Sequence, residues 1–500
     1  MSYDIIIVGA GHNGLAAGVI LARAGWKVLI LESQQEPGGA IRTGEVTLPG
    51  FHHDLYATNL NAFAGSAFVQ EFGPALARHG LAFVRAQKAF CSVFPDGEWV
   101  GVTTSIDETV ANIATRSKRD SIRWHELYRR YQAMARHIFQ MLREPMPSWS
   151  GLRAALSCPS ALPLIFESSG GFAARHFEDP KMHALWAVWA MHLDFAPDTA
   201  GGALYSFLQC MQAQERGLQV ATGGAQSMIS ALASLFRELG GELRCGIAVE
   251  EIDTDRGTAI GVVAGGVRIA SRQGIIANLT PTALFDRIVK DAPASVVNKA
   301  RQFRHGPGTM MLHLALSDLP DWKSRAARDY FYVHIAPSLA GMQQAYCDAL
   351  AGRLPDNPVL VVAQPTIVDP SRAPPGRHVL SVQVRAVPGD LDWQRVKTDY
   401  ADRVIDLLES HAPGLRGRIL GCHVISPADL ERDNPNLVGG DSVSGSHHLS
   451  QNLVNRPFLG WSRYRTPIRR LYLCGAATWP GAGSGAGSGW ILGHMLAGNR

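Results

Sequence analysis

The chain has 500 residues and a mass of 54.0 kDa, which is enough for two or three domains. Hydrophobic residues make up 46% of it and charged residues 18%, so the chain can bury a large core and is not disordered. Its 47 basic residues against 43 acidic ones leave a net charge of only +4, with no block of like charges. This composition argues against a nucleic-acid-binding protein.

The sequence also argues against a membrane-spanning or disulfide-rich protein. No apolar stretch reaches the roughly 18 residues of a transmembrane helix, and the N-terminus lacks the basic region of a signal peptide. The seven cysteines are dispersed, odd in number and without a C-x-x-C pair. They predict neither a disulfide framework nor a dithiol redox centre. We therefore expect a cytoplasmic protein without a metal site.

The predicted elements alternate between strands and helices, which is typical of an α/β fold. The N-terminal pattern predicts a β–α–β unit. Large apolar residues at helical spacing predict helix from about 105 to 142. Four prolines between 145 and 163 then predict loops or short helices. Segment 182–193 is apolar almost throughout and predicts a buried helix. The alternatives are the wall of an apolar substrate tunnel, formed with Trp186, Trp189 and Met191, and a helix on a membrane surface, for which the segment lacks a basic face. The expected strands are 3–8, 27–31, 242–252, 261–264, 274–277, 310–316, 359–363, 378–384 and 471–475, and the expected helices include 15–24, 227–239, 399–408 and 490–496.

A glycine motif follows the first predicted strand and opens the first predicted helix. Gly9, Gly11 and Gly14 form G-x-G-x-x-G, in which the glycines permit a tight turn, a close approach of a pyrophosphate and close packing of helix on strand. The helix N-terminus offers free N–H groups to the phosphates. Glu32, at the end of the second strand, would accept the ribose hydroxyls and disfavours a 2′-phosphate. The motif therefore predicts FAD or NAD, rather than NADP or an unliganded turn.

Two further glycine-rich segments favour FAD. Gly38, Gly39 and Ala40 precede Arg42, which could neutralise phosphate charge or line the flavin; the alternative is a surface turn with a solvated arginine. Near the C-terminus, the glycine-rich loop 480–487 leads into an apolar helical run and again predicts an anion-binding site, unless it is a flexible tail.

The chain resembles the phytoene-desaturase-like flavoproteins, and more closely the branch typified by pyridine nucleotide-disulphide oxidoreductase domain-containing protein 2. The resemblance rests on the opening segment 3–15 with its His12-Asn13 pair, on Gly38-Gly39, on 49–51, 223–224, 240–241 and 249, and on 456–457, 464–468 and 471–475. It is strong at both ends and weak between about 90 and 220. It implies a glutathione-reductase-type FAD-binding Rossmann domain interleaved with a mixed α+β substrate domain, and it places the 480–487 loop against the flavin pyrimidine, where donors would favour hydride uptake. One difference is that Ala482 stands between Gly481 and Gly483, where the family usually has glycine.

Motifs and resemblance together give the expected domains and cofactor site. We expect an FAD-binding domain of residues 1–85, 215–300 and 465–500, and a substrate domain of residues 86–214 and 301–464. The residues expected to bind FAD are Gly9, Gly11, His12, Asn13, Gly14, Glu32, Ser33, Gly38, Gly39, Ala40, Arg42, Val249, Gly475, Pro480, Gly481, Gly483 and Ser484.

The resemblance implies an FAD-dependent desaturase or dehydrogenase that passes a hydride from an apolar or aromatic small molecule to flavin N5, with oxygen, a quinone or another acceptor reoxidising the flavin. An amine oxidase, a redox-neutral double-bond isomerase and a non-catalytic flavin-bound interaction protein are the alternatives. Amine oxidases of this fold carry a lysine near N5, but the corresponding strand, 308–316, has none. His313 on that strand could serve as a base, and His53 and Tyr56 could face the substrate; each has a structural role as its alternative.

Overall fold

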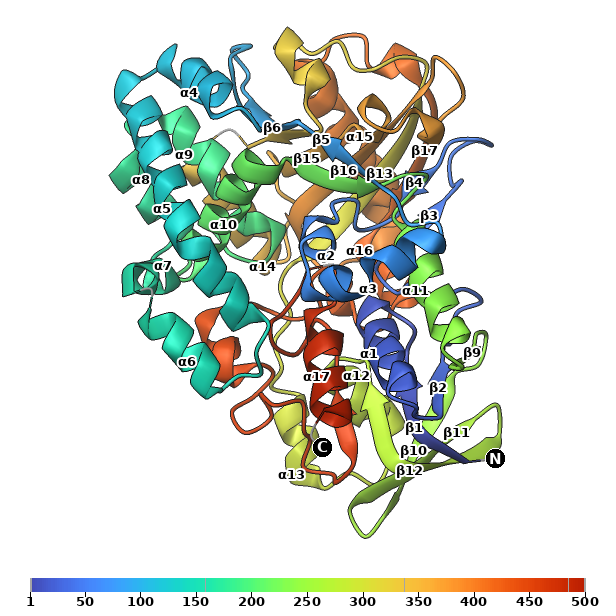
Figure 1. Ribbon diagram of the computed structural model, residues 1–500. Coiled ribbons are helices and arrows are strands. Elements are labelled where there is room, and N and C mark those ends of the chain that lie inside the picture. Colours follow the sequence, from blue (N-terminus) through green and yellow to red (C-terminus); the bar gives the residue numbers. More distant parts are fainter. Residues whose placement is uncertain (1, 158, 337, 484, 499–500) are drawn as a thin grey trace.

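The described part of the chain contains two large β-sheets, one in each lobe of the molecule (Figure 1). The computed structural model describes residues 2–157, 159–336, 338–483 and 485–498. Within these residues the first sheet has seven strands, in the order β10-β11-β12-β1-β2-β9 with β18 beside β12. The strands are β1 (Ser2–Val8), β2 (Val28–Leu31), β9 (Glu242–Arg244), β10 (Val249–Asp255), β11 (Thr258–Ala264), β12 (Val267–Ala277) and β18 (Leu471–Leu473).

The centre of this sheet is parallel and covered by helices. β1 pairs in parallel with β2 and β12, and β12 with β18, so the carboxyl ends of these strands meet at one edge. Strands buried on both faces need continuous apolar runs, as in residues 5–8 and 28–31. The first lobe also contains α1 (His12–Arg23), α3 (Ala67–Arg78), α11 (Gln226–Glu238), α12 (Pro281–Ala283), α13 (Ala294–Ala300) and α17 (Gly487–Ala497).

The closest helix contact in this lobe joins the two ends of the chain. α1 and α17 lie side by side, and a Cβ on Gly489 would sit only 2.0 Å from the carbonyl oxygen of Asn13. The Asn13 amide oxygen accepts a hydrogen bond from the Gly489 N–H (3.2 Å). A glycine is therefore required where the last helix crosses the first turn of α1.

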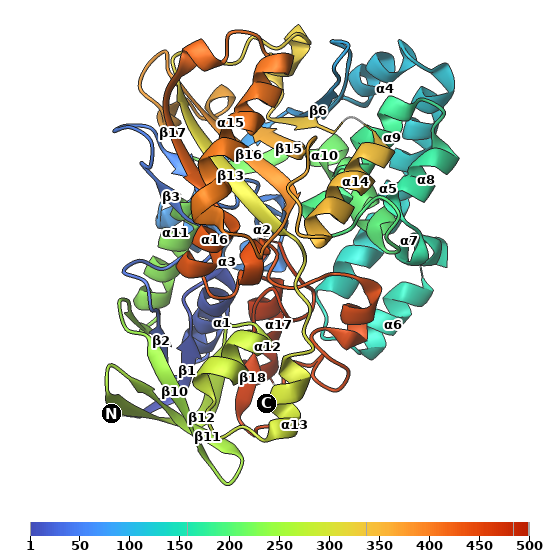
Figure 2. The same ribbon diagram turned by 180° about the vertical axis from the view of Figure 1, so that it is seen from behind.

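The second sheet also has seven strands within the described residues, in the order β17-β13-β16-β15-β14-β6-β7. Figure 2 shows it from the side of α15 (Trp393–His411). Its strands are β6 (Lys88–Val93), β7 (Trp99–Thr103), β13 (Gly308–Leu316), β14 (Tyr332–Ile335), β15 (Val359–Ala363), β16 (His378–Val387) and β17 (Ile419–Ile425). Short pairs β3 (Thr43–Gly44)–β4 (His53–Asp54) and β5 (Phe83–Ala86)–β8 (Leu218–Ala221) complete the strands.

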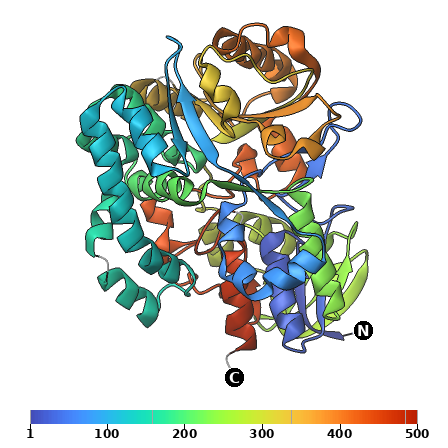
Figure 3. The same ribbon diagram turned by 45° about the horizontal axis from the view of Figure 1, so that its top comes forward.

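A layer of helices lies beside the second sheet, coloured cyan to green in Figure 3. Ser105 and Ser117 cap the first two of these helices, so the predicted helical stretch is divided at residues 115–117. The remaining helices are α2 (Asn61–Ala64), α4 (Ile106–Ala114), α5 (Lys118–Leu142), α6 (Trp149–Leu156), α7 (Leu162–Phe166), α8 (Ser169–His176), α9 (Pro180–Ala187), α10 (Gly202–Arg216), α14 (Leu339–Leu350) and α16 (Pro427–Asp433).

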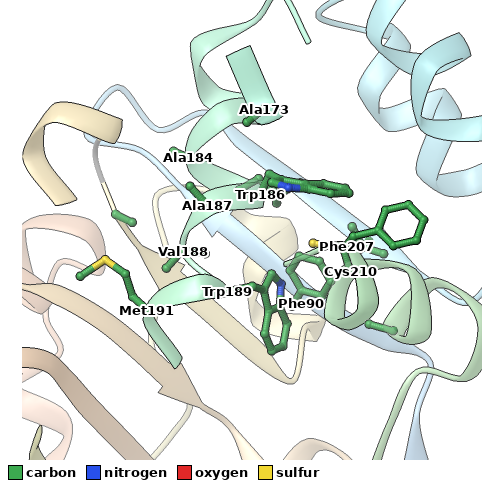
Figure 4. Close-up of a cluster of buried hydrophobic side chains, with 14 of the residues drawn as sticks. Phe90, Ala173, Ala184, Trp186, Ala187, Val188, Trp189, Met191, Phe207 and Cys210 are labelled. Atoms are coloured by element: carbon green, nitrogen blue, oxygen red, sulfur yellow. The ribbon is translucent and has the colours of Figure 1, made fainter. Parts of the chain in front are cut away.

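Segment 182–193 is buried, as predicted, but it is not one helix. α9 ends at Ala187 and the chain continues as a tighter 3-10 turn over Ala190–His192. Trp186 packs in the core against Phe207, and Trp189 packs edge-on against Phe90 (Figure 4). The break lets the segment bury both indoles and still turn toward the junction of the two lobes.

A buried charge cluster ties the lobes together. Arg372 is fully buried and pairs with Asp54 of β4 (3.0 Å) and with Asp369 (2.7 Å). Its guanidinium also donates to the carbonyl of Ala221, and Asp54 accepts from the N–H of Ala225. One arginine of the second lobe therefore holds both β4 and the segment that leads into α11.

The predicted α/β fold is confirmed. The strands of the first sheet come from residues 2–31, 242–277 and 471–473, and those of the second from residues 88–103 and 308–425. The numerical division into domains given above stays a prediction. Among the described residues, no helix combines the length and apolarity needed to cross a bilayer.

Candidate active site

A cavity of about 550 Å³ lies between the two lobes. Its walls come from the carboxyl edge of the first sheet, from segments 56–62 and 433–444, and from strands β13, β14 and β16 of the second sheet. A site at the carboxyl ends of parallel strands is typical of nucleotide-binding α/β proteins.

The first glycine motif forms one end of this cavity. Gly9 has a positive φ of 95°, and a Cβ on Gly14 would lie 2.4 Å from the carbonyl oxygen of Gly9. α1 begins after Gly11 without a side-chain cap, so its first N–H groups stay open to an anion. Gly9, Gly11, His12 and Asn13 line the cavity, whereas Gly14 lies behind them.

The acid predicted to bind ribose lies beside this loop. Glu32 is only 7% exposed and lines the cavity together with Ser33. Its carboxylate accepts hydrogen bonds from the N–H groups of Ala10 (2.7 Å) and Gln34 (3.0 Å). These bonds fix the carboxylate and leave lone pairs for hydroxyl donors.

The second glycine segment lies against the first. Gly38 donates its N–H to the carbonyl of Ala10 and has a φ of 153°. Glycine is required at this position, because a Cβ there would lie 2.5 Å from the carbonyl oxygen of Ile41. Gly39, Ala40 and Arg42 line the cavity. Arg42 forms no ion pair with a carboxylate in the described part of the chain, so its charge is available to a phosphate.

The C-terminal loop closes the cavity from the other side. Gly475, Ala482 and Gly483 line it, whereas Pro480 and Gly481 line a second cavity next to it; Ser484 lies outside the described residues. The N–H of Ala482 donates to His447 Nε2 (2.8 Å) and is therefore not one of the free donors expected in this loop.

The His12-Asn13 pair joins the two glycine-rich loops. The His12 ring is hydrogen-bonded to the Asn13 amide (3.0 Å) and to the backbone of Gly483. Burial lowers the pKa of His12 to about 4, against the effect of the bond to Gly483, so the ring is neutral at pH 7. Asn13 in turn holds the first turn of α17, as described above.

Other cofactor-side residues have no local sequence signal. Val249, one of the residues predicted to bind FAD, lies at the start of β10 and lines the cavity. Asn278 follows β12 and donates its amide to the Gly9 carbonyl (3.3 Å), and it also lines the cavity. Its position at the end of a buried parallel strand is the only feature that could have drawn attention to it.

The opposite end of the cavity belongs to the second lobe. The lining residues are Trp189, His192, Tyr205, Gln209, Gln212, Thr309, Met311, Tyr332, Gln383, Arg385 and Ser442. Sequence reasoning named Trp189 as a candidate tunnel wall but missed the substrate-side role of the others. Most of them are uncharged, four carry apolar or aromatic side chains, and none of the described lining residues is a lysine.

Arg385 is the one charged side chain of the second sheet that lines the cavity in the described part of the chain. It is 5% exposed, and each of its side-chain nitrogens donates hydrogen bonds. Nε donates to the carbonyl of Met191, and Nη1 donates to the hydroxyls of Thr309 and Ser442. Nη2 donates to the carbonyls of His192 and Leu193. Burial lowers the pKa of Arg385 to about 10, which still leaves it charged at pH 7. Within the described residues Arg385 forms no ion pair with a carboxylate, although the charges of Asp441 and Asp194 act on it from farther away.

His192 and His334 form a histidine pair at the cavity wall. Their Nε2 atoms are 3.2 Å apart, and the His192 ring stacks on Trp189 with a centroid distance of 4.4 Å. Burial, with smaller effects from His334 and Arg385, holds the pKa of His192 well below its ordinary value. His192 is therefore a neutral imidazole that faces the cavity.

Of the three predicted catalytic residues, only Tyr56 lies at the cavity. Its hydroxyl is 3.4 Å from Asp433, and burial with the Asp433 charge raises its pKa to about 12. His53 and His313 are fully buried, with their ring centroids 5.3 Å apart. Neither of them is among the described residues that line the cavity. Burial lowers the pKa of both rings, that of His53 to about 3. His53 bonds Thr47 (2.8 Å) and His313 bonds Ser381 (3.2 Å), so both are packed groups.

Comparison with known proteins decides the family. Residues 14–487 match the sequence profile described as flavin containing amine oxidoreductase. The chain belongs to this family. The cofactor is therefore FAD, which the open helix N-terminus, the fixed Glu32 and the Arg42 guanidinium fit, and the protein is an FAD-dependent oxidoreductase.

Relatives of this flavin-containing protein confirm the resemblance seen in its sequence. It is 26% identical to pyridine nucleotide-disulfide oxidoreductase domain-containing protein 2 of Rattus norvegicus over 99% of this chain and 93% of the relative. It is also 26% identical to the zeta-carotene-forming phytoene desaturase of Myxococcus xanthus (96% and 90%), and 24% identical to the lycopene-forming phytoene desaturase of Pseudescherichia vulneris (96% and 95%). Putrescine oxidase bound to putrescine superposes with a TM-score of 0.65 at 15% identity, covering 100% of this chain and 99% of that one. The FAD-binding Rossmann fold with a substrate domain is thereby confirmed.

Proposed function

We propose that this protein is an FAD-dependent desaturase or dehydrogenase that oxidises a neutral or anionic, apolar or aromatic small molecule. FAD, when bound, supplies the redox chemistry by accepting a hydride at N5. We further propose that the cavity-lining residues of the three glycine-rich segments, with Glu32, Arg42 and Val249, hold it. Oxygen, a quinone or another acceptor reoxidises it.

The observation that carries the proposal is the buried charge of Arg385. The Arg385 guanidinium hydrogen-bonds only to neutral groups in the described part of the chain, with Asp441 and Asp194 acting on it from farther away, and its charge opposes an ammonium group that would have to lose its hydration in the same cavity. The absence of lysine from the described lining residues also separates this site from that of a lysine-dependent amine oxidase. Both features favour desaturation over amine oxidation.

The walls of the substrate end support an apolar or aromatic substrate. Trp189, Tyr205, Tyr332 and Met311 present rings and a thioether to the cavity. Burial raises the pKa of Tyr205 to about 12 and that of Tyr332 above the ordinary range, so both phenols stay protonated. Such a surface binds flat apolar groups through area and ring contacts.

We propose His192 as the group that takes the proton released by the substrate. Its Nε2 is engaged with His334, so Nδ1 is the atom that would receive the proton. The hydrogen bond to His334 fixes the orientation of the His192 ring. Tyr56 cannot take this role near neutral pH, since its pKa is raised.

The test is an anaerobic absorbance titration of the FAD-loaded protein with neutral apolar compounds, apolar carboxylates and primary amines. We expect the flavin band near ~450 nm to bleach with members of the first two groups and not with amines. Bleaching by amines alone would refute the proposal in favour of an amine oxidase. A band that no compound bleaches would instead point to an isomerase that needs reduced flavin or to a non-catalytic protein.

Replacing His192 by glutamine is expected to slow flavin reduction by about 100-fold or more, because the proton loses its acceptor. In the unmodified protein the rate should be constant between about pH 6 and 8 and fall in acid, because His192 must be neutral and its pKa lies below about 6.5. Stopped-flow reduction across this pH range measures both effects. The control is His183→Gln, because His183 lies in the same helical layer but does not line the cavity. An unchanged rate and pH profile in His192→Gln would rule out this role.

A further inference from the structure

Helix α10 presents a stripe of polar side chains to the first cavity. Tyr205, Gln209 and Gln212 are spaced i, i+4 and i+7, so they lie on one face of the helix. All three line the first cavity and also line the second cavity beside it, which has a volume of about 710 Å³. The opposite face of α10 packs into the apolar core through Phe207 and Cys210 (Figure 4). We call Tyr205, Gln209 and Gln212 the α10 polar stripe.

The polar groups of this stripe have no partner within the described part of the chain, where neither the two amides nor the phenol hydroxyl forms a hydrogen bond. Gln212 is nevertheless only 9% exposed, so most of its surface is withheld from bulk water. Gln214 of the same helix is 1% exposed, and its amide accepts from Trp124 Nε1 (2.9 Å) and donates to the carbonyl of Thr103 (2.8 Å). The glutamine of α10 that faces the core is therefore paired on both atoms, whereas the two that face the cavity are not.

The second sheet adds a further unpaired amide to the same cavity. Gln383 of β16 lies between Met311 of β13 and Val361 of β15, and it lines the cavity. Its side chain also forms no hydrogen bond with any described residue. A glutamine between apolar neighbours on a central strand costs stability unless its amide finds a partner. A helix and a strand therefore both offer the cavity amides that only a ligand or water can pair.

These groups match an oxygen acceptor on the ligand. Burial raises the pKa of Tyr205 to about 12, against the opposing charge of Arg385, so its hydroxyl remains a hydrogen-bond donor at pH 7. Each glutamine amide adds an NH₂ group with two donors. A pure hydrocarbon would displace water from the stripe and leave these donors unpaired, which lowers its affinity.

We propose that the substrate carries a carbonyl or carboxylate oxygen on its apolar body, and that the α10 polar stripe donates hydrogen bonds to this oxygen. The inference rests on the proposed function, because it names the polar part of the same apolar or aromatic substrate. It makes Gln209 and Gln212 specificity-determining residues, since a hydrocarbon of similar size cannot pair their amides.

The test is the binding of three phenyl compounds of similar length to the FAD-loaded protein: butylbenzene, 4-phenyl-2-butanone and 3-phenylpropanoate. Anaerobic calorimetry measures each dissociation constant, and flavin absorbance is followed separately. We expect the ketone or the carboxylate to bind at least about tenfold more tightly than butylbenzene. Tighter binding of the ketone would identify a neutral oxygen function, and tighter binding of the carboxylate would identify an anionic one.

The double variant Gln209→Leu/Gln212→Leu keeps the size of both side chains and removes their amides. It should weaken the binding of the preferred oxygenated compound at least about tenfold and leave that of butylbenzene unchanged or tighter. Tyr205→Phe, which keeps the ring, should weaken the same compound by about three- to tenfold. The matched control is Gln140→Leu, because Gln140 is exposed and lines the second cavity but not the first; it should bind like the unmodified protein. Flavin content shows that each variant is folded.

Butylbenzene that binds as tightly as the oxygenated compounds would overturn the inference. A preference that survives in the double variant, or oxygenated compounds that do not bind at all, would overturn it too. A preference of the expected size without bleaching of the flavin by any compound would refute the proposed desaturation and leave the polar stripe standing. Bleaching by butylbenzene without a preference for oxygen would do the opposite.

Discussion

Replacing Gly14 by alanine is expected to abolish stable FAD binding. The added Cβ would lie 2.4 Å from the carbonyl oxygen of Gly9, 3.1 Å from Asn278 Nδ2 and 3.3 Å from Ile7. The nearest of these atoms belongs to the backbone of the phosphate-binding turn itself, so the turn has to move. We expect a loss of FAD affinity of at least about 100-fold and a destabilisation of about 1–3 kcal/mol.

The bound flavin of the purified variant and its dissociation constant measure this effect. Gly417→Ala is the control, because nothing among the described residues lies within 4 Å of its added Cβ and it should keep full flavin content. Stoichiometric FAD in the Gly14 variant would show that the turn does not hold the pyrophosphate as proposed.

Replacing Arg372 by alanine is expected to cost about 3–5 kcal/mol of unfolding free energy, because it leaves the carboxylates of Asp54 and Asp369 buried without their counter-charge. Arg353→Ala removes an exposed arginine from its pair with Asp348 and should cost less than about 1 kcal/mol. Urea unfolding of the three proteins at pH 7 makes the comparison.

The same substitution has a defined pH dependence. Burial acts to raise the pKa of Asp369, but hydrogen bonds from Ser371 and Arg372 outweigh it and hold the pKa below its ordinary value. A lowered carboxyl pKa contributes stability that is present above the unfolded value and is lost as the pH falls. The difference between the unmodified protein and Arg372→Ala should therefore narrow at about pH 3. A difference that stays constant down to that pH would show that the ion pair is not its source.

The cofactor side was accessible to sequence reasoning because its signals are local. The glycines that the turns require, the acid at the end of β2 and the open start of α1 all follow one another within about 40 residues. Asn278 could not be predicted from the sequence, because its hydrogen bond to Gly9 joins residues 269 positions apart and no local sequence pattern indicates it.

The substrate side was not predictable, since it is assembled from single residues of many elements. Trp189, Thr309, Tyr332 and Arg385 meet only after the second sheet has formed. Their residue types, apart from the arginine, are those of an ordinary buried core. Only the fold shows that their side chains line a cavity.

His313 illustrates the limit of an argument from strand periodicity. The strand at 308–316 was predicted well, and alternation puts Thr309, Met311 and His313 on one face. The first two line the cavity, but the strand then runs away from it, so His313 packs against Ser381 and His53. Alternation predicts on which face of the strand a side chain lies, but only the tertiary structure shows whether that part of the strand borders the cavity.

The contact between α1 and α17 has a consequence for biosynthesis. The strand β18 and the helix α17 that covers α1 are translated about 450 residues after α1 itself. Until then α1 has an uncovered apolar face and the FAD cavity lacks the wall formed by residues 475–483. Contacts of such long sequence separation form slowly and leave exposed surface during synthesis. The nascent chain therefore exposes this apolar face until α17 has been translated, and the cofactor cavity is complete only then.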